Sequence, residues 1–127
     1  MSTIIEYELS PLPKTWVFDL DGTLVVHNGV YQGKDILLPG VKDFFSQINE
    51  NDFVIIMTAR PEQLKGPTTD FLKQEGIRYD LILFGLPTGE RILLNDIKNS
   101  GLKTAYGVNL NRDEGLEKVR FVINTEL

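Results

Sequence analysis

The sequence Trp16-Val17-Phe18-Asp19-Leu20-Asp21-Gly22-Thr23-Leu24 carries the strongest structural signal in this chain. Three apolar residues run without alternation into an acid, which is typical of a strand covered on both faces of a parallel sheet. Asp19 then falls at the carboxyl end of that strand, the edge at which open α/β sheets bind ligands. Gly22 permits a sharp turn and a close approach of the backbone to a ligand.

The two acids of this stretch can do three kinds of chemistry. Together Asp19 and Asp21 can hold a divalent cation through oxygen. One can attack an electrophile, as aspartate does when an aspartyl-phosphate forms, and the other can transfer a proton. For an isolated Asp-x-Asp, a turn in which the second acid binds backbone amides is the commoner interpretation.

The full string is more specific than its acid pair, because it continues as Gly22-Thr23-Leu24. From Val17 to Leu24 it resembles the first signature of the haloacid dehalogenase-like (HAD) phosphotransferase superfamily. The resemblance implies that Asp19 attacks phosphorus and becomes an aspartyl-phosphate. It also implies that Asp21 protonates the leaving alcohol, and that Mg²⁺ is held by Asp19, the backbone carbonyl of Asp21 and a later acid.

Length and composition set wider limits. A chain of 127 residues with 42% hydrophobic residues is expected to form one soluble domain, covering 1–127. The net charge of −5 argues against nonspecific nucleic-acid or acidic-membrane binding, so neither is expected as a partner. The absence of cysteine excludes disulfides and thiolate catalysis. No leader or membrane-spanning run is recognised, so the expected location is the cytoplasm.

The remaining patterns predict an α/β fold: a Rossmann-like three-layer sandwich with a mainly parallel five-stranded sheet and an HAD-like core without a cap domain. Residues 1–14 are expected to be an arm or edge strand, and 25–38 a small flap, because Asn28-Gly29 is a hairpin signal. His27 lies in that flap and is interpreted as solvated. Strands are predicted at 15–18, 53–57, 81–84, 92–94 and 105–110, with an edge strand at 119–123, a helix from Pro39-Gly40, and a helix over 61–76 interrupted at Gly66-Pro67.

The second predicted strand delivers Thr58-Ala59-Arg60 to the same sheet edge. A hydroxyl followed by free amides at a helix start suits phosphate binding, although Thr is also an ordinary N-cap residue. Thr58 matches the superfamily's second signature, which implies that it binds the transferring phosphoryl group. Arg60 either reaches phosphate or is surface charge, and Gly22 is a further candidate phosphate contact.

The later signatures match less completely. Asn95-Asp96 would follow the fourth strand, where the superfamily carries an acid that completes the Mg²⁺ shell, so Asp96 is the third expected ligand. The superfamily's lysine, often Gly-Lys-Pro, is replaced here by Gly85-Leu86-Pro87. Three basic residues could supply the missing charge: Lys65, Arg91 and Lys98.

These observations predict a Mg²⁺-dependent phosphomonoester hydrolase that acts through an aspartyl-phosphate, with a sugar phosphate among the expected substrates. The short segments between signatures leave no room for a cap, so an open site is expected. Such a site suits a bulky phosphorylated substrate or completion by a second subunit. Two alternatives stay open: a catalytically weakened HAD-fold binding or regulatory protein and, less favoured, a receiver-like phosphoacceptor domain.

Overall fold

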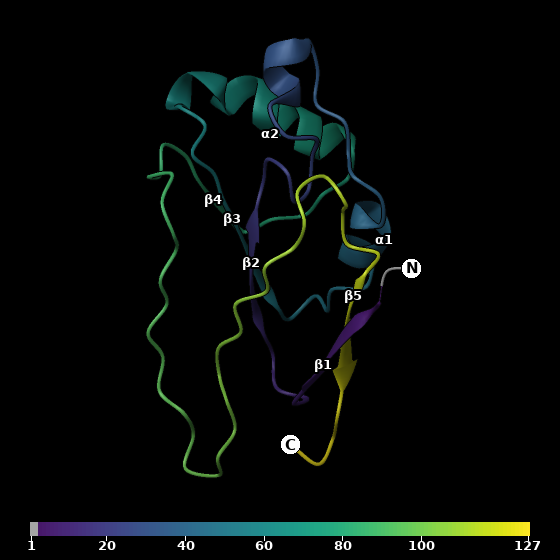
Figure 1. Cartoon of the computed structure of the whole chain (residues 1–127), viewed down its shortest axis with the longest axis vertical. Helices are drawn as coiled ribbons and strands as arrows, with labels where there is room; N and C mark the ends of the chain where they lie inside the picture. The colour runs from purple at the N-terminus through teal and green to yellow at the C-terminus, as the bar shows by residue number, and fades with distance from the viewer. Residues whose placement is uncertain (1–2) are drawn as a thin grey trace.

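Three parallel strands carry the predicted site in the computed structural model, which describes residues 3–127. They are β2 (Thr15–Asp19), β3 (Phe53–Met57) and β4 (Leu81–Leu83), hydrogen-bonded in the order β2-β3-β4 (Figure 1). Helix α1 (Val41–Ser46) lies in the connection from β2 to β3, and α2 (Lys65–Gln74) in the connection from β3 to β4. Such crossovers are what parallel pairing requires, and they bring the carboxyl ends of all three strands to one edge.

The two outer segments of the chain form a second sheet. Strand β1 (Ile5–Leu9) pairs in parallel with β5 (Val119–Ile123). The sequence predicts an arm or edge strand within 1–14 and an edge strand at 119–123, and the structure pairs these two segments with each other. Aromatic packing joins this sheet to the first, because the ring centroids of Trp16 on β2 and Phe121 on β5 lie 5.1 Å apart.

The prediction of one five-stranded sheet is wrong for this structure. Residues 92–94 and 105–110 form no strand, and the chain from 91 to 110 makes a long excursion without helix or strand (Figure 1). Its turn is closed by hydrogen bonds from the N–H of Gly101 to the carbonyl of Lys98 and from the N–H of Lys98 to the carbonyl of Leu102. The apolar run Ile92–Leu94 is 68–86% exposed. High β propensity makes a strand only where a partner strand and a covered face are present.

Helix α2 is continuous where the sequence predicts an interruption. It begins at Lys65, after the 3₁₀ turn η2 (Glu62–Leu64), so Gly66 and Pro67 occupy its first turn. The first N–H groups of a helix have no intrahelical acceptor, and proline there costs no hydrogen bond. The predicted end holds: Gly76 has φ +72°, and the N–H of Ile77 donates to the carbonyl of Leu72.

The segment 25–38 is a closed loop in place of the predicted hairpin flap. One antiparallel bridge between Val25 and Leu37 closes it, and the 3₁₀ turn η1 (Gly29–Gln32) follows Asn28. Asn28 adopts the left-handed conformation, so its turn signal is real, but no strands flank it. Throughout residues 3–127, every helix is too short or too polar to cross a lipid bilayer.

Gly115 is predicted to be far less replaceable than Gly76. Both have positive φ, +79° and +72°, but a Cβ at Gly115 would overlap the carbonyl group of Pro39, whereas one at Gly76 would meet open space. Gly76→Ala should therefore cost about 1–2 kcal/mol for the left-handed backbone alone. Gly115→Ala should cost clearly more, since backbone must move. Urea unfolding midpoints at constant m-value measure both, and equal losses would contradict this reasoning.

Candidate functional site

The carboxyl ends of β2 and β3 bring the predicted site residues Asp19 and Thr58 to one edge of the sheet. Asp19 is the last residue of β2 and pairs in register with Met57, so Thr58 follows directly beside it on the neighbouring strand. Thr58 is 1% exposed, and its Oγ1 accepts the N–H of Arg60 at 3.0 Å. Backbone hydrogen bonds to Leu83 and Leu86 hold Thr58 in place. A hydroxyl can also donate one hydrogen bond, and that of Thr58 donates to no acceptor among the described residues.

The turn after Asp19 closes on itself. The carbonyl of Leu20 accepts the N–H groups of Thr23, Leu24 and Val25, and the N–H of Gly22 donates to the carbonyl of Val25 at 2.7 Å. Gly22 has φ +85°, as the sequence indicated for a sharp turn. Its amide is already used, however, so the structure does not offer it as the phosphate contact that was expected.

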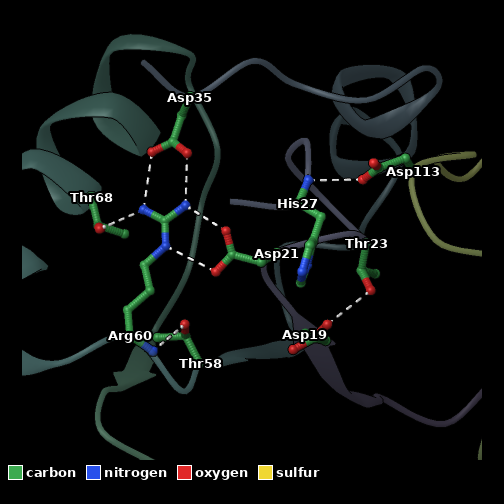
Figure 2. Close-up of polar contacts among 9 residues, drawn as sticks. All are labelled: Asp19, Asp21, Thr23, His27, Asp35, Thr58, Arg60, Thr68 and Asp113. Carbon is green, nitrogen blue, oxygen red and sulfur yellow. Dashed lines mark hydrogen bonds and ion pairs between the residues drawn. The ribbon is translucent and has the colours of Figure 1, made fainter. Parts of the chain in front are cut away.

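The polar loop that contains Asp113 is hydrogen-bonded to this turn and to the residues that follow it. The N–H of Asp113 donates to the carbonyl of Gly22 at 2.9 Å, and Oδ1 of Asp113 accepts the N–H of His27 at 2.8 Å. The imidazole of His27 lies near the acid pair in Figure 2, and its Nδ1 is buried without a partner in the described chain. His27 is therefore part of the site's surroundings and not the freely solvated residue that was expected.

Asp19 is the most accessible of the site carboxylates. Its side chain is 41% exposed, and its Oδ2 accepts the hydroxyl of Thr23 at 3.1 Å (Figure 2). Its Oδ1 accepts Nη1 of Arg91 at 2.7 Å. Of the three basic residues considered for the missing lysine, Arg91 is the one that the structure places against Asp19. Asp19 and Thr23 also line a cavity of about 440 Å³ whose walls come from β1, β2, β5, α1 and the excursion.

Asp21 is held by a buried arginine. Nε and Nη2 of Arg60 donate to the two carboxylate oxygens of Asp21 at 3.0 and 2.8 Å (Figure 2). Arg60 is 3% exposed, and its remaining donors bind Asp35 and Thr68. Burial by itself lowers the pKa of Arg60, but hydrogen bonds and charge from Asp21 and Asp35 outweigh it and raise that pKa. The guanidinium is thus permanently charged, and all of its donors are engaged within the described chain. This differs from both expectations for Arg60, a phosphate contact or a surface charge.

The expected third metal ligand, Asp96, is not gathered with Asp19 and Asp21 in the described chain. Asp96 belongs to the excursion, whose turn at 98–101 extends past the opposite end of the strands (Figure 1). The backbone carbonyl of Asp96 accepts the hydroxyl of Thr104, which also contacts Asn95. Across residues 3–127, no three acidic or histidine side chains are gathered so that they could hold a metal ion. The expected Mg²⁺ set of Asp19, Asp21 and Asp96 is not assembled in this structure.

The other two basic candidates are exposed. Lys65 begins α2, and Lys98 lies at the turn of the excursion. Sequence reasoning missed Asp35, Thr68 and Asp113. Asp35 follows a loop, Thr68 sits within a helix, and Asp113 belongs to a polar stretch, so no local spacing marks any of them. Only the contacts made across 25 or more residues, as between Asp35 and Arg60, identify Asp35 as part of the site.

Fold and site together define an α/β protein with parallel strands and a buried Asp–Arg–Asp network beside an accessible aspartate. Two chains of solved structures are similar to it. One, from the Pnkp1/Rnl/Hen1 complex, is 31% identical over 65% of this chain and 31% of that chain, with a TM-score of 0.50. The other, from the Pnkp1/Rnl/Hen1 RNA repair complex, is 30% identical over 67% and 30%, with a TM-score of 0.50.

This chain therefore spans about a third of the length of each of those chains. No protein-family model and no curated protein matches it. The comparisons support the α/β arrangement with parallel strands.

Proposed function

We propose that this chain is a phosphomonoester hydrolase, with an HAD-like core, that works through an aspartyl-phosphate on Asp19. The observation that carries the proposal is the accessible Asp19 beside Asp21 and Thr58 at one sheet edge. An anionic carboxylate attacks an anionic phosphate only where positive charge and aimed donors offset their repulsion. Arg91 and the hydroxyl of Thr58 are the groups positioned to do so here.

The proposed reaction has two steps. An oxygen of Asp19 forms a bond to phosphorus while the bond from phosphorus to the alcohol oxygen breaks. Asp21 gives a proton to that oxygen, which requires it first to take up the proton on one of its oxygens and to release the hydrogen bond that this oxygen accepts from Arg60. Asp21, now ionised, takes a proton from a water molecule that hydrolyses the aspartyl-phosphate, which releases inorganic phosphate and restores both acids.

Magnesium dependence is a separate part of the proposal. Asp19 and Asp21 supply hard oxygen donors of the kind that Mg²⁺ prefers, but Asp96 is not beside them. The steps above are therefore assigned only to side chains that the structure brings together. When bound, a cation would add neutralising charge at the phosphate. Hydrolysis measured in Mg²⁺ and in excess EDTA tests this part independently of the aspartyl-phosphate.

The direct test is a phosphatase assay on p-nitrophenyl phosphate and a panel of sugar phosphates. A phosphorylated oligoribonucleotide belongs in the panel because the two similar chains come from an RNA repair complex. Release of inorganic phosphate from at least one member is the expected result. No release from any member, with the protein folded, would overturn the proposed hydrolase.

One observation favours a second function, a phosphate-binding protein with weakened catalysis. Both oxygens of Asp21 are bound to Arg60, and Asp96 is not gathered with Asp19 and Asp21 in the described chain. Such a protein would bind inorganic phosphate in a manner that depends on Thr58 and Arg91, yet turn over none of the panel. Isothermal titration with phosphate beside the assay separates the two functions.

Arg91 is predicted to supply the charge that the superfamily takes from lysine. Arg91→Gln should lower kcat/KM by about 10²-fold, the usual cost of one lost electrostatic donor at a reacting oxygen. Lys65→Gln, at an exposed position on α2, is the matched control and should stay within about twofold of the wild type. Steady-state measurement of kcat/KM on one substrate compares the two variants with the wild type. A larger loss for Lys65→Gln would show that the charge comes from elsewhere.

A further inference from the structure

The guanidinium of Arg60 is held from three sides. Besides the two hydrogen bonds to Asp21, its Nη1 and Nη2 donate to the carboxylate of Asp35 at 3.0 and 2.7 Å, and Nη1 donates to Oγ1 of Thr68 at 2.8 Å (Figure 2). Its donors are thus all used within the described chain. Because the fork is planar and rigid, fixing one side of it fixes the side that faces Asp21.

Asp35 and Thr68 come from different parts of the chain. Asp35 lies in the loop between Gly33 and Leu37, with its side chain 4% exposed, and Thr68 lies on α2 and is 1% exposed. In the described residues, the side-chain hydrogen bonds of both go to Arg60 alone. Both residues therefore reach the reaction only through the arginine.

A buried ion pair is weak evidence for a purely stabilising role. Desolvation of the charges cancels much of their attraction, and apolar residues of similar size often stabilise a fold as well or better. The ion pair does constrain geometry, however: an acid that transfers a proton must be held close to its working position by groups that are themselves fixed. Two further anchors on Arg60 satisfy that need.

We propose that Asp35 and Thr68 are positioning residues for Asp21, acting through Arg60. The inference rests on the proposed function, in which Asp21 protonates the leaving oxygen. Loss of positioning should then matter most for substrates that need this proton. An alkyl phosphate has a poor leaving group and depends on the acid, whereas p-nitrophenolate departs without one.

The experiment compares Thr68→Val with wild type on β-glycerophosphate and on p-nitrophenyl phosphate. Thr68→Val keeps the side-chain volume and removes one hydrogen bond to Arg60. We expect kcat on β-glycerophosphate to fall by about 10-fold or more, within the range that a general acid contributes. The pre-steady-state burst of p-nitrophenolate should stay within about twofold of wild type. Turnover after the burst should slow, since Asp21 also activates the water.

Two controls distinguish positioning from folding. Thr69→Val changes the next residue, whose hydroxyl binds helix backbone, and should behave like wild type on both substrates. Thr68→Ser restores the hydroxyl and should restore β-glycerophosphate turnover. Asp35→Asn should repeat the pattern with a larger loss. If Asp35→Asn does not fold, the Thr68 variants decide the matter alone.

Each outcome has a distinct meaning. Equal loss of the burst and of β-glycerophosphate turnover in Thr68→Val would show a merely structural role and overturn the positioning proposal while the hydrolase stands. Unchanged kinetics on both substrates would overturn it as well. A wild-type protein that hydrolyses neither compound and no member of the substrate panel would instead overturn the proposed function, and this inference with it.

Discussion

Asp19→Asn is expected to abolish the proposed phosphatase activity, with kcat on p-nitrophenyl phosphate reduced by at least about 10³-fold. The amide keeps the shape of the side chain and can still accept the hydroxyl of Thr23, so the fold should be preserved. It removes the nucleophilic oxygen and the charge that pairs with Arg91. Stopped assays for inorganic phosphate, supported by a thermal melt, measure the effect.

The matched control for Asp19→Asn is Asp70→Asn. Asp70 is an exposed acid on α2, and the same chemical change there should leave kcat unchanged. Substantial activity in Asp19→Asn would mean that the nucleophile lies elsewhere, and the aspartyl-phosphate mechanism would then be wrong. A stable phosphorylated wild type without turnover, after treatment with acetyl phosphate, would support the receiver-like alternative.

Arg60→Met is expected to have the largest effect on stability. It removes the cation shared by Asp21 and Asp35 and leaves two carboxylates in a site where the Arg60 side chain is 2% exposed. Removing one partner of a buried ion pair costs about 3–5 kcal/mol, because the remaining charge is uncompensated. The free energy of unfolding from urea titration should fall by about that amount, with an unchanged m-value.

The surface pair between Arg120 and Glu6 provides the comparison. Its side chains are 60% and 44% exposed, and Arg120→Met should cost about 0–1 kcal/mol, as exposed ion pairs do. A loss for Arg60→Met no greater than that for Arg120→Met would show that the buried network contributes little to folding. Its role would then rest on positioning alone.

Local sequence patterns predicted much of the fold correctly. The strand at 53–57 was predicted at its observed bounds. The strand predicted at 15–18 is observed at 15–19, one residue longer. Each is a continuous apolar run, a pattern typical of parallel strands that acts on the run itself. The structure covers one face of these two strands, with Val54 and Ile56 at 0% exposure, and leaves Val17 and Phe53 of the other face 48% and 46% exposed. The turn at Gly22 and the helix end at Gly76 were predictable from a different local property. Both positions have a positive φ, which strongly favours glycine.

Patterns that depend on distant partners were predicted less well. The apolar run Ile92–Leu94 has strand-forming residues but no partner strand, and it stays exposed. Pro67 was expected to break a helix because the point where α2 starts could not be read from the residues around it. In each case the residue type was interpreted correctly, but its neighbours in space were unknown.

The candidate site divides along the same line. The sequence by itself determined that Asp19 ends one strand, that Asp21 lies in the glycine turn after it, and that Thr58 directly follows a second strand, because strand patterns and glycine turns are local properties. That these two strands are neighbours was implied by the family resemblance, and the structure pairs them in parallel. Only the tertiary structure decided that Arg60 is buried between Asp21 and Asp35, that Arg91 reaches Asp19, and that Asp96 stays apart. Ion pairs form between groups distant in the chain, and no spacing along the sequence encodes which carboxylate a buried guanidinium will meet.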